Sequence, residues 1–119
     1  MTQEVFINKL PPSLNGKDGL IRMHWAKKSQ LSKTWVWLIH AENMNPHLGR
    51  VQVEFTRVST RKMDYDNIRA SFKLVGDALV RCGIIQDDSP DFITELKVKW
   101  KKAKTLKEQG IMIKIEDVV

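Results

Sequence analysis

Hydrophobic and polar residues alternate in four short stretches of the chain, and this alternation predicts four β-strands. The stretches are residues 4–10, 51–56, 92–101 and 111–116. In the last of them Ile111, Ile113 and Ile115 share one side, and polar or flexible side chains take the other. Each strand is therefore expected to bury one face and to expose the other.

A first helix is predicted between the first two strands. Apolar residues fall at helical spacing at Leu31, Trp35 and Leu38, and either of two serines, Ser29 or Ser32, could cap the start. The helix should end by residues 43–45, because the proline at position 46 disfavours helix in the residue before it. Trp35 and Trp37 would point in different directions, so at most one of these two tryptophans is expected in the core.

A second helix is predicted from about residue 67 to residue 81. Its apolar stripe consists of Ile68, Phe72, Val75 and Leu79. Asp66 or Asn67 is expected to cap its start, and Gly83 is placed to end it. Gly76 inside the helix suggests close packing against the sheet.

The order of these elements is β-α-β-α-β-β, which predicts an α+β fold in one domain covering residues 1–119. We expect a mixed sheet with two helices packed on it, and a hairpin between the third and fourth strands. No apolar run approaches the ~20 residues of a membrane span, and the N-terminus lacks a signal-peptide pattern. A single cysteine, Cys82, excludes an internal disulfide and fits a cytoplasmic location.

The chain is basic, with a formal net charge of +6, and this favours a polyanionic partner such as nucleic acid. Residues 13–27 mix cations with an aromatic side chain, notably Lys17, Arg22 and Trp25. This segment could face phosphate and base, or it could be a solvated loop with Trp25 anchored to the core.

Negative charge is nevertheless concentrated in one part of the chain, since six of the eight aspartates lie in residues 61–91. Two carboxylates ~4 Å apart repel by roughly 4 kcal/mol at an effective dielectric constant near 20. Asp64 and Asp66 are two residues apart, so in an extended segment both would point to one side. Asp87 or Asp88 could join them if the loop 83–88 folds back after the second helix, or if the sheet order brings the third strand beside the second.

Three such carboxylates suit Mg²⁺ or Mn²⁺ and a phosphate substrate, whereas no histidine or cysteine spacing supports zinc. Each residue also has a simpler explanation. Asp66 could be a helix cap, Asp88 a turn residue, and Lys73 with Asp77 a surface ion pair.

Several of these residues form a pattern that resembles the RusA family of Holliday-junction resolvases, which are often carried by prophages. The pattern consists of Asp64-Tyr65-Asp66-Asn67, Phe72-Lys73, Asp77-Ala78-Leu79, Gly83 and Asp87-Asp88, together with Pro11-Pro12-Ser13 and Asn15 after the first strand. The resemblance covers most of the chain, and its central motif is fairly specific.

The resemblance implies a homodimeric, Mg²⁺-dependent endodeoxyribonuclease that nicks four-way DNA junctions symmetrically in recombination and repair. The family's catalytic, metal-binding aspartates fall on Asp64, Asp66 and Asp88, and its catalytic lysine falls on Lys73. Counted forward from Asp66, this lysine comes three residues later than in typical members. Arg69 is therefore the alternative for the basic role.

Phosphate contacts are expected from basic residues around the motif and along the third strand. These residues are Arg57, Arg61, Lys62, Arg69, Lys97, Lys99 and Lys101. Two other hypotheses remain open, a non-catalytic relative that binds branched DNA and a nuclease that acts on other branched substrates.

Overall fold

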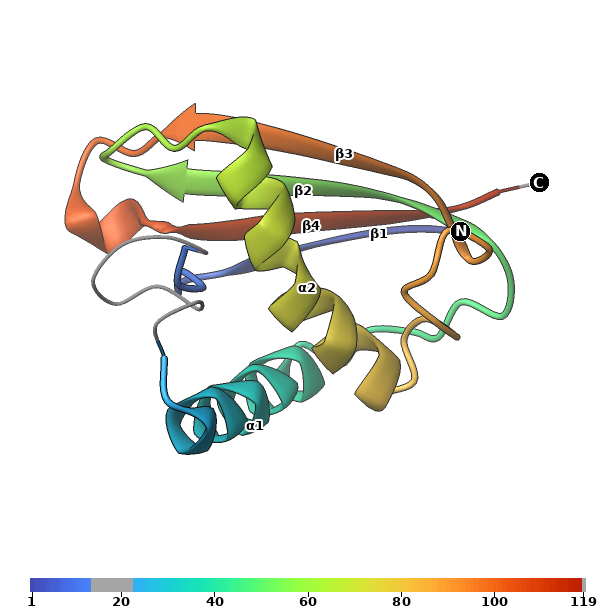
Figure 1. Cartoon of the computed structure of the whole chain (residues 1–119). Coiled ribbons are helices and arrows are strands. Elements are labelled where there is room, and N and C mark those ends of the chain that lie inside the picture. Colours follow the sequence, from blue (N-terminus) through green and yellow to red (C-terminus); the bar gives the residue numbers. More distant parts are fainter. Residues whose placement is uncertain (14–22, 119) are drawn as a thin grey trace.

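Two helices cover one face of a four-stranded sheet, and the opposite face of the sheet is open (Figure 1). The structure is a computed structural model, and it describes residues 1–13 and 23–118. Its elements are β1 (Thr2–Ile7), α1 (Trp25–Ala41), β2 (Val51–Ser59), α2 (Tyr65–Arg81), β3 (Ile93–Lys102), the 3₁₀ turn η1 (Leu106–Glu108) and β4 (Gly110–Asp117). The Asn15-Gly16 turn and the cations Lys17 and Arg22 lie outside the described residues.

The predicted α+β fold, with the order β-α-β-α-β-β and a mixed sheet, is confirmed. The strands are arranged β1-β4-β2-β3, and only the β2–β3 pair is parallel. The predicted hairpin between β3 and β4 is wrong, because β2 lies between them. Helix α2 returns the chain to the starting end of β2, so β3 runs parallel to β2. Residues 103–109 then cross the end of β2 to reach β4.

The core lies between the covered face of the sheet and the two helices. Ile111, Ile113 and Ile115 of β4 are fully buried, as the alternating pattern predicted. From α1, Trp35 is fully buried while Trp37 remains 76% exposed, so only one of these two tryptophans belongs to the core. The remaining large buried side chains come mainly from β2 and α2, including Val51, Val53, Phe55, Ile68, Val75 and Leu79.

The helix starts differ from the prediction by a few residues. Helix α1 begins at Trp25 rather than near Ser29 or Ser32, because the His24 ring accepts a hydrogen bond from the backbone N–H of Ala26. Helix α2 begins at Tyr65, and its cap is Asp64 rather than Asp66 or Asn67. The predicted ending at Gly83 is confirmed, since this residue has φ = 73°.

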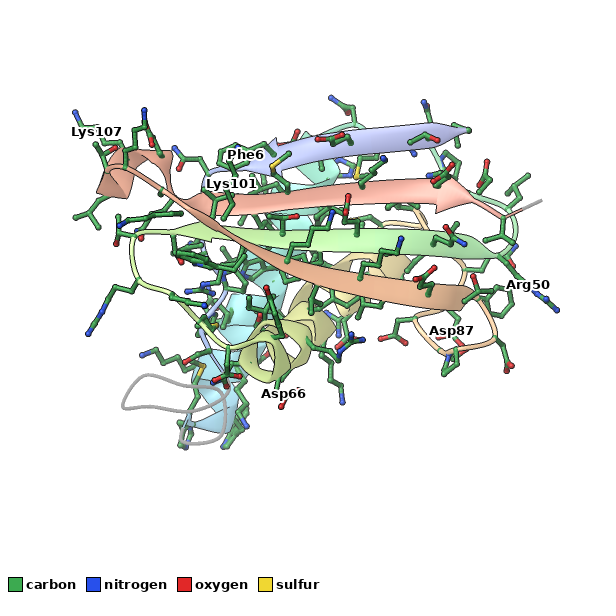
Figure 2. The ribbon with its side chains drawn as sticks, turned by 90° about the horizontal axis from the view of Figure 1, so that it is seen from above. Phe6, Arg50, Asp66, Asp87, Lys101 and Lys107 are labelled. Atoms are coloured by element: carbon green, nitrogen blue, oxygen red, sulfur yellow. The ribbon has the colours of Figure 1, made fainter. Side chains whose placement is uncertain are left out.

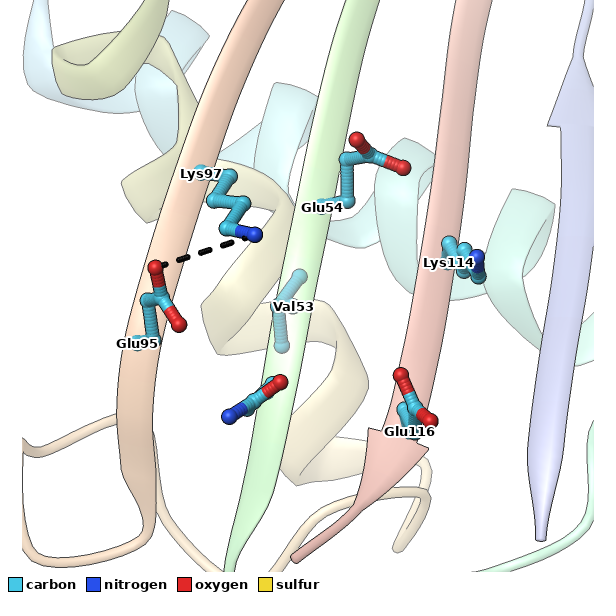
Figure 3. Close-up of a pocket in the computed structure, with 7 residues that line it drawn as sticks. Val53, Glu54, Glu95, Lys97, Lys114 and Glu116 are labelled. Atoms are coloured by element: carbon cyan, nitrogen blue, oxygen red, sulfur yellow. Dashed lines mark ion pairs between the residues drawn. The ribbon is translucent and has the colours of Figure 1, made fainter.

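The open face of the sheet carries charges of both signs. A shallow hollow on this face is lined by Glu54, Glu95, Glu116, Lys97 and Lys114, with Gln52 and Val53 (Figure 3). Lys97 lies 3.9 Å from Glu95, and Lys99 forms an ion pair with Glu54. The open face is therefore balanced in charge rather than uniformly basic. No helix among the described residues is long and apolar enough to cross a membrane.

Candidate functional site

The parallel pairing of β2 and β3 separates the aspartates that sequence analysis grouped together. Asp64 and Asp66 follow the carboxyl end of β2, whereas Asp88 precedes the amino end of β3. In the sheet Val51 is aligned with Ile93. The two groups of carboxylates therefore lie at opposite ends of these two neighbouring strands, and Asp66 and Asp87, the residue before Asp88, lie well apart in Figure 2.

Asp64 is the N-terminal cap of α2. One carboxylate oxygen accepts a hydrogen bond from the backbone N–H of Asn67, and the other accepts one from the Asn67 amide, both at 2.9 Å. Asp64 itself is extended, but Asp66 already belongs to the helix, so the expected extended segment with both carboxylates on one side is absent. Both carboxylates instead lie at the positive end of the helix dipole, which stabilises them.

Asp88 lies against the middle of α2, where it contacts Asp77. A Cβ built on Gly76 would lie 3.6 Å from the Cβ of Asp88, which is an ordinary van der Waals distance, and 3.2 Å from the ring of Phe72. Burial raises the pKa of Asp88, and a hydrogen bond to Asp77 and its charge raise it further. The predicted close packing of Gly76 is thus mainly against Phe72 of the same helix, and none of the nearest atoms belongs to the sheet.

Asp77 is the residue whose role sequence analysis missed. It was interpreted as an ion-pair partner of Lys73, but in the described structure no ion pair joins these two side chains. The signal that could have identified it is the adjacent Gly76, because a glycine inside a helix often marks a close approach by another segment.

The described structure does not bring three candidate metal ligands together in one subunit. Asp66 precedes Gly76 by ten helical residues, which places the Asp88 loop about 15 Å along the helix axis. No group of three His, Cys, Asp or Glu side chains able to hold a metal occurs among residues 1–13 and 23–118. The candidate carboxylates are therefore divided between two places along α2.

Both candidate basic residues for catalysis lie near Asp88. Arg69 and Lys73 line one pocket of about 410 Å³ together with Asp88 and the first residues of β3. Lys73 is one turn from Asp77, and Arg69 is one turn closer to the start of α2. The structure thus places Lys73 beside Asp88 rather than beside Asp64 and Asp66, with Arg69 between the two groups.

A second pocket, of about 550 Å³, adjoins the start of α2. Three of the predicted phosphate-binding residues, Arg57, Arg61 and Lys62, line it together with Asp64 and Asn67. Arg57 alternates with the buried residues of β2, so it points to the covered side of the sheet and is only 9% exposed. This pocket therefore combines positive charge with the amino end of a helix.

The predicted basic residues of β3 lie on the other side of the sheet. Lys97, Lys99 and Lys101 are paired in register with Glu54, Thr56 and Val58 of β2, and all three lysines are exposed on the open face. Lys99 lowers the pKa of Glu54 through their hydrogen bond. The lysines of β3 and the pocket at Arg57 consequently do not form one continuous surface.

No protein-family model matches the chain, and no curated protein matches it.

Replacing Asp77 by asparagine should raise the melting temperature at neutral pH. The folded-state pKa of Asp88 is raised, so its ionisation favours unfolding once the pH exceeds the unfolded-state value of about 3.9. The loss of stability caused by ionised Asp88 is complete above its folded-state pKa, and it is absent at pH 3, where the carboxyl is protonated in both states. Thermal melts of Asp77→Asn should therefore show a gain at pH 7 that disappears at pH 3.

The control for this prediction is Asp91→Asn, which removes the same charge from the exposed loop before β3. It should change the melting temperature less than Asp77→Asn does at pH 7. An equal gain from both variants would show that general charge, rather than the contact with Asp88, determines the effect.

Proposed function

We propose that this protein is a Mg²⁺-dependent endodeoxyribonuclease that resolves four-way DNA junctions as a homodimer. The observation that carries the proposal is the contact between Asp77 and Asp88 beside the cations of α2, Arg69 and Lys73. Two like charges are held together at the surface, next to Gly76 of α2. Phosphodiester hydrolysis uses this combination of gathered carboxylates and nearby cations.

A stability argument alone does not account for this acidic contact. Partial desolvation of Asp88 and its neighbour Asp77 both oppose ionisation, but both carboxylates are exposed, so the resulting cost to folding at neutral pH is small. Positions that carry such a cost are enriched in functional sites. The resemblance of the motif to the RusA family supports the same activity.

The proposal requires a second subunit, because Asp64 and Asp66 lie about 15 Å along α2 from the Asp88 loop. A two-fold axis across the middle of α2 would set the start of one helix beside Asp77 and Asp88 of the other subunit. The dimer would then have two identical acidic sites, each built from both subunits. A four-way junction is itself close to two-fold symmetric, so paired sites suit paired cuts.

The basic residues have separate roles in this proposal. Arg69 and Lys73 lie between the two acidic groups and would face the phosphate that is cut, where positive charge stabilises the developing negative charge. Arg61 and Lys62 would hold the DNA backbone next to the site. Affinity for DNA should therefore fall steeply with salt concentration.

Cleavage of a synthetic four-way junction in Mg²⁺ tests the proposal, with a linear duplex of the same sequence as reference. The variant Asp64→Asn should lose activity by a factor of about 100 or more, the loss typical when a charge-stabilising group is removed from an active site. Junction binding should be kept or tightened, because one negative charge facing phosphate is gone. Asparagine still accepts a hydrogen bond from Asn67, so the helix cap survives.

The variant Glu42→Gln is the matched control, since it removes one exposed carboxylate at the end of α1 and should cleave normally. Junction binding without cuts in any divalent metal would indicate a non-catalytic protein that binds branched DNA. Equal cutting of the linear duplex and the junction would indicate a nuclease without selectivity for four-way junctions.

A further inference from the structure

Arg57 is a buried cation that has few hydrogen-bond partners in the part of the chain that the structure describes. Its side chain is only 9% exposed, and one guanidinium N–H donates to the backbone carbonyl of Pro11 at 2.9 Å. The Nε atom is buried and finds no acceptor among the described residues. Burial lowers the pKa of the guanidinium. A buried charge with free N–H groups is costly, so an anion that accepts from it would stabilise the protein.

Among residues 1–13 and 23–118, the neighbours of Arg57 do not provide this anion. The carboxylate of Asp64 lines the same pocket, but it caps α2 through Asn67 and forms no ion pair with Arg57 among the described residues. The hydroxyl of Ser59 donates to the backbone carbonyl of Arg61. The hydroxyl of Thr60 donates to the side chain of Gln109. The polar groups around the guanidinium are thus engaged with one another.

The pocket has the charge, and more than enough room, for an anionic group. Its volume is about 550 Å³, and Arg61 and Lys62 add two exposed cations at its edge. The start of α2 lies in the same wall, but Asp64 and Asp66 already occupy the positive end of its dipole, so the positive charge of the pocket comes from Arg57, Arg61 and Lys62. A planar guanidinium with several parallel N–H donors matches the oxygen atoms of a phosphate better than a point charge does.

We propose that Arg57, Arg61 and Lys62 form a phosphate-binding pocket that holds one internal phosphodiester of a DNA strand beside Asp64. The identity of the ligand as DNA rests on the proposed function, whereas the affinity for phosphate rests on the pocket alone. Arg57 is distinguished from the lysines of β3, which lie on the opposite face and are partly paired with glutamates. One bound strand would therefore contact the covered side of the sheet, at the carboxyl end of β2.

Inorganic phosphate is the first probe. It should raise the melting temperature of the wild-type protein more than sodium chloride of equal ionic strength does, because a ligand that binds the folded state stabilises it. Arg57→Gln should lose this gain. Arg50→Gln should keep it, since it removes the same charge from an exposed position at the other end of β2 (Figure 2). An equal gain in wild type and Arg57→Gln would overturn the proposal.

A second variant allows the pocket to be tested even if Arg57→Gln does not fold. The double variant Arg61→Gln/Lys62→Gln changes only exposed side chains and should fold normally, yet its gain with phosphate should be smaller than that of the wild type. An unchanged gain in this variant would show that the pocket, as defined here, does not bind phosphate.

Single-stranded oligonucleotides with a 5′-phosphate or a 5′-hydroxyl distinguish the two sources of phosphate. Equal affinity for both supports an internal phosphodiester, whereas a requirement for the 5′-phosphate would overturn that assignment in favour of a strand end.

For Arg57→Gln, the slope of log affinity against log salt should become shallower by about one. If the oligonucleotides bind through Arg57 but no junction is cut, the phosphate-binding pocket is supported and the proposed nuclease activity is contradicted. If junctions are cut while Arg57→Gln binds the oligonucleotides normally, the phosphate-binding pocket is contradicted and the proposed nuclease activity is still supported.

Discussion

Mixed dimers of Asp66→Asn and Asp88→Asn subunits should cut four-way junctions, although neither variant cuts when it is alone. If each site takes Asp66 from one subunit and Asp88 from the other, the mixed dimer contains one site with both substitutions and one site with neither. The intact site should nick one strand, so the expected product is singly nicked junction DNA. Subunits carrying two different affinity tags allow the mixed dimer to be purified before the assay.

The reciprocal mixture provides the control. Wild-type subunits paired with the double variant Asp66→Asn/Asp88→Asn should be inactive if the sites are shared, because each site then contains one substitution. Sites contained within one subunit predict the reverse pattern, with cleavage by this second mixture and none by the first. The two mixtures therefore separate the two arrangements by the presence or absence of a product.

The largest effect on stability is expected from Gly110→Ala. A Cβ at this position would lie 2.3 Å from the backbone carbonyl oxygen of Ile7 and 2.6 Å from the ring of Phe6. The ring could rotate, but the carbonyl belongs to the strand and cannot move without disturbing the pairing of β1 with β4. We expect a loss of about 3 kcal/mol in the free energy of unfolding, at the upper end of the usual cost of overpacking. Urea denaturation followed by circular dichroism measures it.

Gly49→Ala is the matched control, because no atom lies within 4 Å of a Cβ built there and its φ is not in the positive range. Its effect on the free energy of unfolding should stay within about 0.5 kcal/mol, as for most surface substitutions. Similar stabilities for the two variants would contradict the close approach of β1 to Gly110.

Periodicity predicted the elements and their buried faces, but it did not predict the order of the strands. Ile111, Ile113 and Ile115 face the core in any arrangement that buries one side of β4, so their burial followed from the sequence. The position of β3 depends instead on where α2 returns the chain. Its parallel alignment with β2 also separates Asp88 from Asp64. The predicted cluster of aspartates and the predicted hairpin between β3 and β4 were therefore wrong for the same reason.

The orientation of Arg57 could have been predicted from the alternation of β2. Val53 and Phe55 are buried, and Arg57 continues the same side of the strand. The charge of Arg57 had suggested a place beside the lysines of β3. The alternation was the better guide, because a strand fixes the direction of its side chains whatever their chemistry.

The place of β3 at the edge of the sheet gives its lysines a protective role that is independent of DNA. One side of β3 pairs with β2, and the other side leaves backbone N–H and C=O groups available to a strand from another molecule. Natural proteins discourage this growth of the sheet with charged side chains, above all lysine, on exposed edges. Lys97, Lys99 and Lys101 would repel the same residues of an approaching copy, and so keep the protein from aggregating through this edge at high concentration.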